Sequence, residues 1–150
     1  MRTLYSMGFA FSPALFEVVM IQKLRPAKYR GYWTGVGGHI ENETPIACMV
    51  REFEEETGLV TNEDQWTKFA TADIGGQARV ELFYSVGLPI HLCSTKTDEM
   101  VEIMKTTDVL SSPAILVEHT ALFIKLAKEH VLWSATLPSN SKAVINLVLP

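Results

Sequence analysis

The segment between Thr44 and Gly58 constrains the fold most, because its sequence carries both ends of a helix. Threonine can cap a first turn and proline suits the first helical position, so Thr44-Pro45 predicts a helix start. Gly58 stands where a glycine would end that helix, since glycine readily adopts a left-handed backbone. We therefore expect a helix over 45–57.

The predicted helix has an acidic face and an apolar face. At about 100° per residue, Arg51 shares one sector of a helical wheel with three carboxylates: Glu52, Glu55 and Glu56. A separate sector, which would face the core, holds Ile46, Val50 and Phe53. Like charges at this spacing repel one another, and the C-terminal end of a helix also disfavours anions. A hard divalent cation would convert this repulsion into coordination. The alternative is an ordinary solvated acidic face, as charge runs usually are.

Charge is concentrated around this helix. The chain has a formal net charge of −4, yet the window from Glu41 to Glu56 alone carries −5 and the remainder carries +1. A basic segment precedes the window, with cations at Lys23, Arg25, Lys28 and Arg30. Arginine favours bidentate contacts with phosphate, so this segment predicts a phosphate-binding loop. An ordinary solvated loop is an equally good interpretation.

The rest of the chain predicts alternating strands and helices in a single domain over 1–150. Alternating or β-branched apolar runs predict strands over 4–11, 16–22, 66–74 and 79–86, with a loop over 24–38. Residues 98–108 fit a short helix or a strand with a loop, 115–131 a long helix, and 143–149 a last strand or packed tail. Strands followed by helices in this order predict an α/β fold, with a mixed β-sheet between helices.

Composition narrows the classes of protein. The two cysteines match no CxxC pattern, which predicts a reducing, cytoplasmic compartment. We expect no signal peptide, no membrane segment and no zinc site, since the histidines are scattered. A pI near 5.5 argues against stable nucleic-acid binding. The apolar segment 143–149 fits either completion of the sheet or the interface of a homodimer.

The acidic helix and its approach resemble a known motif. Gly37 is followed after five residues by Glu43, and after seven more by Arg51-Glu52-Phe53-Glu54-Glu55-Glu56-Thr57-Gly58-Leu59. This resembles the Nudix box, GX5EX7REUXEEXGU, at its seven fixed positions: Gly37, Glu43, Arg51, Glu52, Glu55, Glu56 and Gly58. Phe53 replaces an aliphatic residue. Gly38-His39-Ile40-Glu41-Asn42-Glu43 is one residue shorter than the usual GGxxExGE.

The resemblance implies a Nudix-type α/β/α sandwich that hydrolyses the pyrophosphate bond of nucleoside diphosphate derivatives, by water attack at phosphorus with Mg²⁺ or Mn²⁺. It implies that Glu52, Glu55 and Glu56, with the backbone of Gly37, bind metal. Glu43 and Arg51 would orient those ligands. The base would be one of the helix carboxylates or a carboxylate from a later loop, for which Glu99 is the candidate.

A second stretch suggests the substrate. Residues 33–38 read Trp-Thr-Gly-Val-Gly-Gly and resemble the W-N-G-F-G-G stretch of MutT-type oxidised-purine nucleoside triphosphatases, with Thr34 in place of the asparagine. By the same resemblance His119 falls where a base-reading asparagine stands, and Trp33 or Phe83 could stack on a base. A nucleotide, most simply an oxidised purine deoxynucleoside triphosphate, is therefore the expected small-molecule partner. The alternatives are ADP-ribose or another NDP-X substrate, and a non-catalytic nucleotide-sensing module.

Overall fold

The chain is built around one mixed sheet, described here from a computed structural model that covers residues 2–136 and 143–150. The strands are β1 (Thr3–Phe11), β2 (Glu17–Gln22), β3 (Trp33–Thr34), β4 (Val36–His39), β5 (Thr67–Ile74), β6 (Ala78–Val86), β7 (Val101–Lys105) and β8 (Ile145–Leu149). The helices longer than one turn are α1 (Pro45–Thr57), α2 (Thr106–Ser111) and α3 (Thr120–Ser134).

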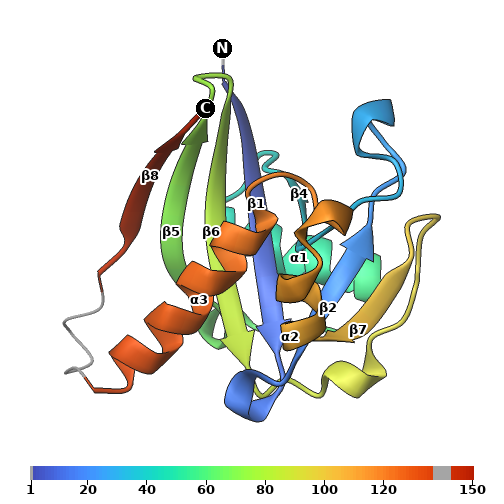
Figure 1. Ribbon diagram of the computed structural model, residues 1–150, viewed down its shortest axis with the longest axis vertical. Coiled ribbons are helices and arrows are strands. Elements are labelled where there is room, and N and C mark those ends of the chain that lie inside the picture. Colours follow the sequence, from blue (N-terminus) through green and yellow to red (C-terminus); the bar gives the residue numbers. More distant parts are fainter. Residues whose placement is uncertain (1, 137–142) are drawn as a thin grey trace.

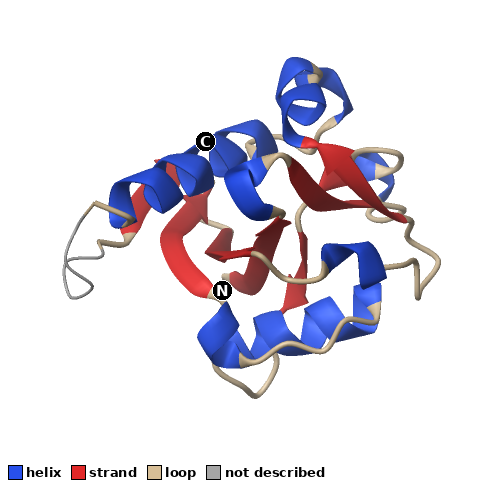
Figure 2. Cartoon of the chain, turned by 90° about the horizontal axis from the view of Figure 1, so that it is seen from below, coloured by secondary structure: helices blue, strands red, loops and turns tan. Residues whose placement is uncertain are grey.

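The sheet order is β3-β2-β1-β6-β5-β8, with β4 pairing to β1 and β7 pairing to β2. β1 runs parallel to β6 and β5 runs parallel to β8, whereas the other pairs are antiparallel. Helix α3 lies on one face of the sheet and α1 on the other, as both views show (Figure 1, Figure 2). This is the predicted α/β fold, with a mixed sheet between helices.

Two apolar cores fill the spaces between the layers. Along β1, Phe9 and Phe11 face the α3 side, whereas Ala10 faces the α1 side, because side chains alternate across a strand. The first core receives Phe123 and Ile124 from α3. The second core is completed by α1 and its neighbours, with Met49, Phe53, Trp66 and Phe83. None of the helices in the described part of the chain is long and apolar enough to cross a membrane.

The predicted helix over 45–57 is confirmed, together with the sequence signals at its ends. The Thr44 side chain accepts a hydrogen bond from Ala47 N at 3.2 Å, and Gly58 adopts the left-handed conformation with φ 80°. The strands predicted over 4–11, 16–22, 66–74 and 79–86 are confirmed with boundaries that move by one residue at most. Of the two alternatives for 143–149, the strand is correct.

The predicted loop over 24–38 is wrong in its second half, where the chain forms the short strands β3 and β4. Glycine makes this possible, because a Cβ on Gly37 would overlap the backbone carbonyl of Ser6 in β1. Residues 98–108 combine both alternatives, since the strand β7 is followed directly by the short helix α2.

The helix predicted over 115–131 starts too early. It begins only at Thr120 and extends to Ser134, because the chain before it is bound to β3. Val117 N donates to Trp33 O at 2.9 Å, and Leu116 forms a bridge with the same residue. His119 then turns the chain into the helix with φ 71°, a left-handed conformation that is uncommon outside glycine.

Candidate active site

The acidic face of α1 packs against β4 at one residue. A Cβ on Gly38 would overlap the carboxylate of Glu52, so this carboxylate lies directly on the backbone of residue 38. Gly37, which matches the motif spacing, packs instead against β1. The motif spacing predicts the backbone of Gly37 as the metal contact. In the structure it is Gly38 that lies against the carboxylate of Glu52.

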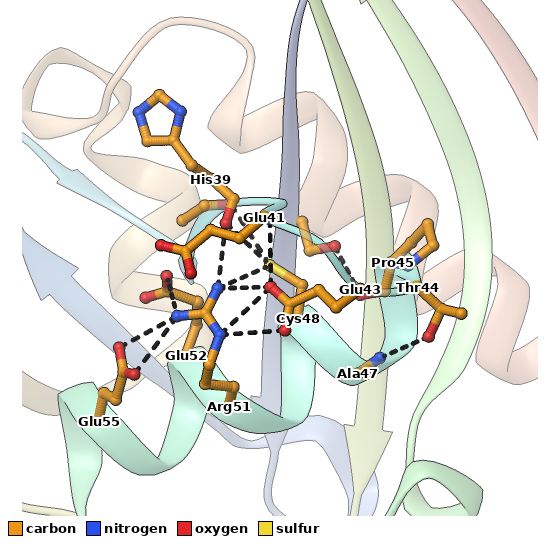
Figure 3. Close-up of polar contacts among 12 residues, drawn as sticks. His39, Glu41, Glu43, Thr44, Pro45, Ala47, Cys48, Arg51, Glu52 and Glu55 are labelled. Carbon is orange, nitrogen blue, oxygen red and sulfur yellow. Dashed lines mark hydrogen bonds and ion pairs between the residues drawn. The ribbon is translucent and has the colours of Figure 1, made fainter.

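Arg51 lies at the centre of the site and contacts three carboxylates (Figure 3). Its Nη2 is 2.6 Å from Glu43 Oε1, and its Nη1 is 3.0 Å from Glu52 Oε1 and 3.3 Å from Glu55 Oε2. Nη2 also donates to the carbonyl of His39 at 3.1 Å. The hydrogen bonds with Glu43 are the main cause of a raised pKa of Arg51, and the Arg51 guanidinium in turn lowers the pKa of Glu43. The predicted pair of orienting residues is therefore in direct contact.

The three helix carboxylates differ in their surroundings. Glu55 is exposed, whereas Glu52 and Glu56 are half-buried, which does not fit a simple solvated face. Glu56 Oε2 is buried and accepts no hydrogen bond from the described residues. Burial, followed by the charges of Glu99 and Glu52, raises the pKa of Glu56 to about 7. Burial also raises the pKa of Glu52. Burial of Glu52 and Glu56 makes their ionised forms unfavourable, and a bound cation would offset this desolvation cost.

Glu99 reaches the same site from the loop before β7. It is 5% exposed and accepts hydrogen bonds from Leu24 N at 2.7 Å and from Lys23 Nζ at 3.3 Å. Its neighbour Asp98 forms an ion pair with Arg25. Two adjacent acids thus hold the beginning of the basic segment beside the helix carboxylates. Sequence reasoning missed this double contact, because no pattern links residues that lie 75 positions apart.

The rest of the basic segment projects into solvent. Lys28 Nζ lies 4.8 Å from the centre of the Tyr29 ring, and both Lys28 and Arg30 are exposed. Of the predicted phosphate-binding residues, Arg25 is engaged by Asp98, whereas Lys28 and Arg30 form no ion pair with a described residue.

The donor atoms suit a hard divalent cation. Glu52, Glu55 and Glu56 supply carboxylate oxygens, which Mg²⁺ prefers, and the buried Oε2 of Glu56 has no partner in the described part of the chain. Within residues 2–136 and 143–150, however, no three acidic, histidine or cysteine side chains converge on one point. The reason is Arg51, which holds Glu52 and Glu55 on its own guanidinium. A metal centre here requires these side chains to turn away from Arg51.

A second group of predicted residues meets where β3 adjoins α3. Thr34 Oγ1 lies 3.3 Å from Thr120 Oγ1, and the adjacent His119 has a buried Nε2 with no partner among the described residues. Trp33 is buried in the α3 core, so its ring is not an open stacking surface. Phe83 is not brought to this region. It is 2% exposed and packs in the α1 core, because alternation along β6 points it to that face.

Cys48 lies between α1 and the glycine loop. It is fully buried, and its thiol lies 3.4 Å from the carbonyl oxygen of His39 and 3.7 Å from that of Gly38. Burial raises the pKa of this thiol to about 11, so it remains a neutral donor. The side chain therefore attaches the glycine loop to α1.

Comparison with known proteins agrees with this architecture. The family model for the NUDIX domain matches residues 12–121. Among solved structures, the chain is similar to a MutT from a study of Aliivibrio salmonicida and Vibrio cholerae, with a TM-score of 0.67, 19% identity and coverage of 86% of this chain and 99% of that one.

Two further solved structures are similar. The NUDIX domain of Shewanella oneidensis NrtR, solved as a complex with ADP ribose, gives a TM-score of 0.73 at 18% identity, covering 87% of this chain and 89% of that one. A MutT/nudix family protein from Enterococcus faecalis gives 0.65 at 17% identity, covering 87% and 62%. At these identities the likeness concerns the fold.

Proposed function

Because the chain belongs to the NUDIX domain family of hydrolases, whose fold supports pyrophosphohydrolase activity, we propose that it hydrolyses a nucleoside diphosphate derivative with divalent metal ions. One observation carries the proposal. The carboxylate of Glu52 lies against Gly38, and Glu56 Oε2 on the same helix is buried without a partner among the described residues. A structural helix gains nothing from such an arrangement.

We assign the residues the following roles. Glu52, Glu55 and Glu56 would hold Mg²⁺ or Mn²⁺, which when bound acidifies the attacking water and neutralises charge that develops on the phosphates. Arg51, fixed by Glu43, contacts Glu52 and Glu55 and would position them before they turn toward the metal.

Glu99 would serve as a positioning residue and not as the base. Leu24 N and Lys23 already occupy its oxygens, so we assign it to positioning the basic segment. Proton abstraction from water would then fall to the helix carboxylates, among which Glu56 has an oxygen, Oε2, that accepts no hydrogen bond from the described residues. Lys28 and Arg30, which are exposed, would meet the distal phosphates of the substrate.

The substrate we favour is a (deoxy)nucleoside triphosphate, such as an oxidised purine deoxynucleotide, cleaved to release pyrophosphate. Support comes from the junction of β3 and α3. The buried hydroxyls of Thr34 and Thr120 contact each other there, and His119 Nε2, which has no partner among the described residues, is the hydrogen-bonding group that remains for a base. A site that hydrogen-bonds the edge of a base discriminates strongly against bases that leave its polar groups unpaired.

ADP-ribose is the second candidate. Its support is the similarity to the NrtR domain that was solved with ADP ribose, where the TM-score of 0.73 exceeds that of the MutT structure. Both candidates share the diphosphate that the carboxylates and cations of this site would bind. We also infer a cytoplasmic location, since both cysteines are free thiols. A single domain over 1–150 is inferred because one sheet includes strands from both ends of the chain.

A panel of substrates with Mg²⁺ and with Mn²⁺ tests the proposal: NTPs, dNTPs, 8-oxo-dGTP, ADP-ribose and dinucleoside polyphosphates. Release of pyrophosphate from triphosphates supports the first candidate, whereas conversion of ADP-ribose to two monophosphates supports the second. Glu56→Gln should abolish turnover, while Glu54→Gln, on the exposed side of the same helix, should retain it. Absence of metal-dependent hydrolysis across the panel would contradict the proposal.

A further inference from the structure

Strand β8 forms an edge of the sheet that lacks the usual protection. The sheet order ends at β8, and no described residue pairs with its outer side. Edge strands normally carry charged residues, proline or bulges that prevent pairing with another chain. Residues 143–149 contain no charge and no proline. The strand β7 at the opposite end differs, because it carries Glu102 and Lys105.

The direction of the backbone groups on β8 follows from one hydrogen bond. Gly75 N donates to Leu149 O at 2.9 Å, so the carbonyl of Leu149 points toward the β5 side. Backbone groups alternate along a strand, and those of Ile145 and Leu147 therefore also point toward β5. The donors and acceptors of Val144, Asn146 and Val148 point outward and are available to a second strand.

The side chains of β8 are only partly covered. Ile145, Leu147 and Leu149 join the α3 core but remain half-buried, unlike the core residues of β5 beside them. On the other face, Val148 is 87% exposed and Val144 is 42% exposed. An additional strand beside β8 would cover part of both sets of side chains and remove their apolar surface from water, which is favourable.

We propose that β8 pairs with β8 of a second copy of this chain, antiparallel and about a two-fold axis at Asn146. A two-fold axis places the residue at the axis opposite its own copy, so a charge at that position would repel itself. This strand is uncharged.

The outward backbone groups fix the register. Asn146 then forms a hydrogen-bonded pair with its own copy, and Val148 faces Val144 of the second copy. On the core face, Ile145 lies opposite Leu147. Asparagine at the axis gives the pair an amide contact that other registers lack, while valine–valine contacts across strands are stabilising.

Sedimentation of the full chain over a concentration series tests the pairing. We expect reversible formation of a species with twice the 16.7 kDa mass of one chain. Asn146→Lys places two like charges at the axis and should shift the midpoint at least tenfold toward higher concentration. Val60→Lys is the matched control, because residue 60 is an exposed valine outside the strand (68%) and should leave the midpoint unchanged.

Cross-linking tests the register. In a hydrogen-bonded antiparallel pair the Cα atoms lie about 5.5 Å apart, which suits a disulfide. Asn146→Cys should therefore form a covalent dimer under mild oxidation, whereas Val148→Cys should not, because residue 148 faces residue 144. The unaltered chain controls for Cys48 and Cys93. A monomer at every concentration, or a dimer that Asn146→Lys leaves unchanged, would overturn the proposal.

Discussion

The carboxylate of Glu52 rests on the backbone of Gly38, and no side chain other than hydrogen fits between them. This contact joins β4 to α1 at the point where the acidic face begins. It explains why a glycine is required at position 38 by geometry, even though the motif spacing counts from Gly37.

Gly38→Ala should displace Glu52 and reduce kcat with little loss of folding. The added methyl must push the carboxylate aside, which the fold tolerates because the carboxylate is the end of a flexible side chain. A misplacement of about 1 Å in a catalytic site can lower the rate about 100-fold. Steady-state kinetics beside a thermal unfolding curve separates the two effects. A variant with normal kcat would show that the position of Glu52 does not matter for turnover.

Mg²⁺ alone should stabilise the protein against unfolding. A ligand that binds only the folded state at about 100 times its dissociation constant adds about 2.7 kcal/mol to the free energy of unfolding. The effect should disappear in Glu56→Gln and persist in Glu54→Gln, since the side chain of Glu54 is solvent-exposed. Thermal unfolding with and without Mg²⁺ measures this directly, and no substrate is needed. Equal stabilisation of both variants would place the metal elsewhere.

Arg51→Lys should lower kcat by about 10- to 100-fold, the range seen when a residue that orients metal ligands is lost. Lysine keeps the positive charge but cannot contact Glu43, Glu52 and Glu55 together, because it lacks the forked guanidinium. If the pair acts as one unit, Arg51→Lys combined with Glu43→Gln should cost little more than either change alone. Additive losses in kcat would show that the two residues act separately.

An ion-pair network around the buried carboxylate of Glu81, on the other half of the sheet, predicts the acid stability of the fold. Lys68 and Arg79 lie 2.6 Å and 2.9 Å from the carboxylate of Glu81, and Thr71 donates to it at 2.8 Å. Burial raises the pKa of Glu81, but these hydrogen bonds outweigh it and leave the pKa below its usual value.

The sign of the pH dependence follows. Glu81 contributes stability above the pKa of an unfolded glutamate, about 4.3, and this contribution is lost as the pH falls through the lower folded value. Glu81→Gln should cost about 1–3 kcal/mol at neutral pH and flatten the stability profile in acid. Glu129→Gln, an exposed position on α3, is the control. Denaturant unfolding at several pH values checks both, and parallel profiles would argue against this role.

Sequence reasoning predicted those features of the fold that depend on residues close together in the chain. The ends of α1 were predictable from Thr44 and Gly58, and its two faces from the helical period. The contact of Glu99 with Leu24 and the start of α3 at Thr120 were not, because each depends on segments that are distant in sequence and meet only in the fold. Gly38 was missed for a related reason, since only packing on β1 shows which glycine faces the helix.

His119→Gly should separate stability from recognition at the junction of β3 and α3. His119 adopts φ 71°, a conformation that costs about 1–3 kcal/mol in a residue with a side chain. Glycine removes this strain but gives up conformational entropy when it folds, so the variant should be as stable as the parent or about 1 kcal/mol more stable. It also deletes the unpartnered Nε2, and KM for the preferred nucleotide should rise about tenfold while kcat changes little. Kinetics on two nucleotides that differ only in the base, together with a melting curve, would check this, and an unchanged KM would show that the side chain does not read the base.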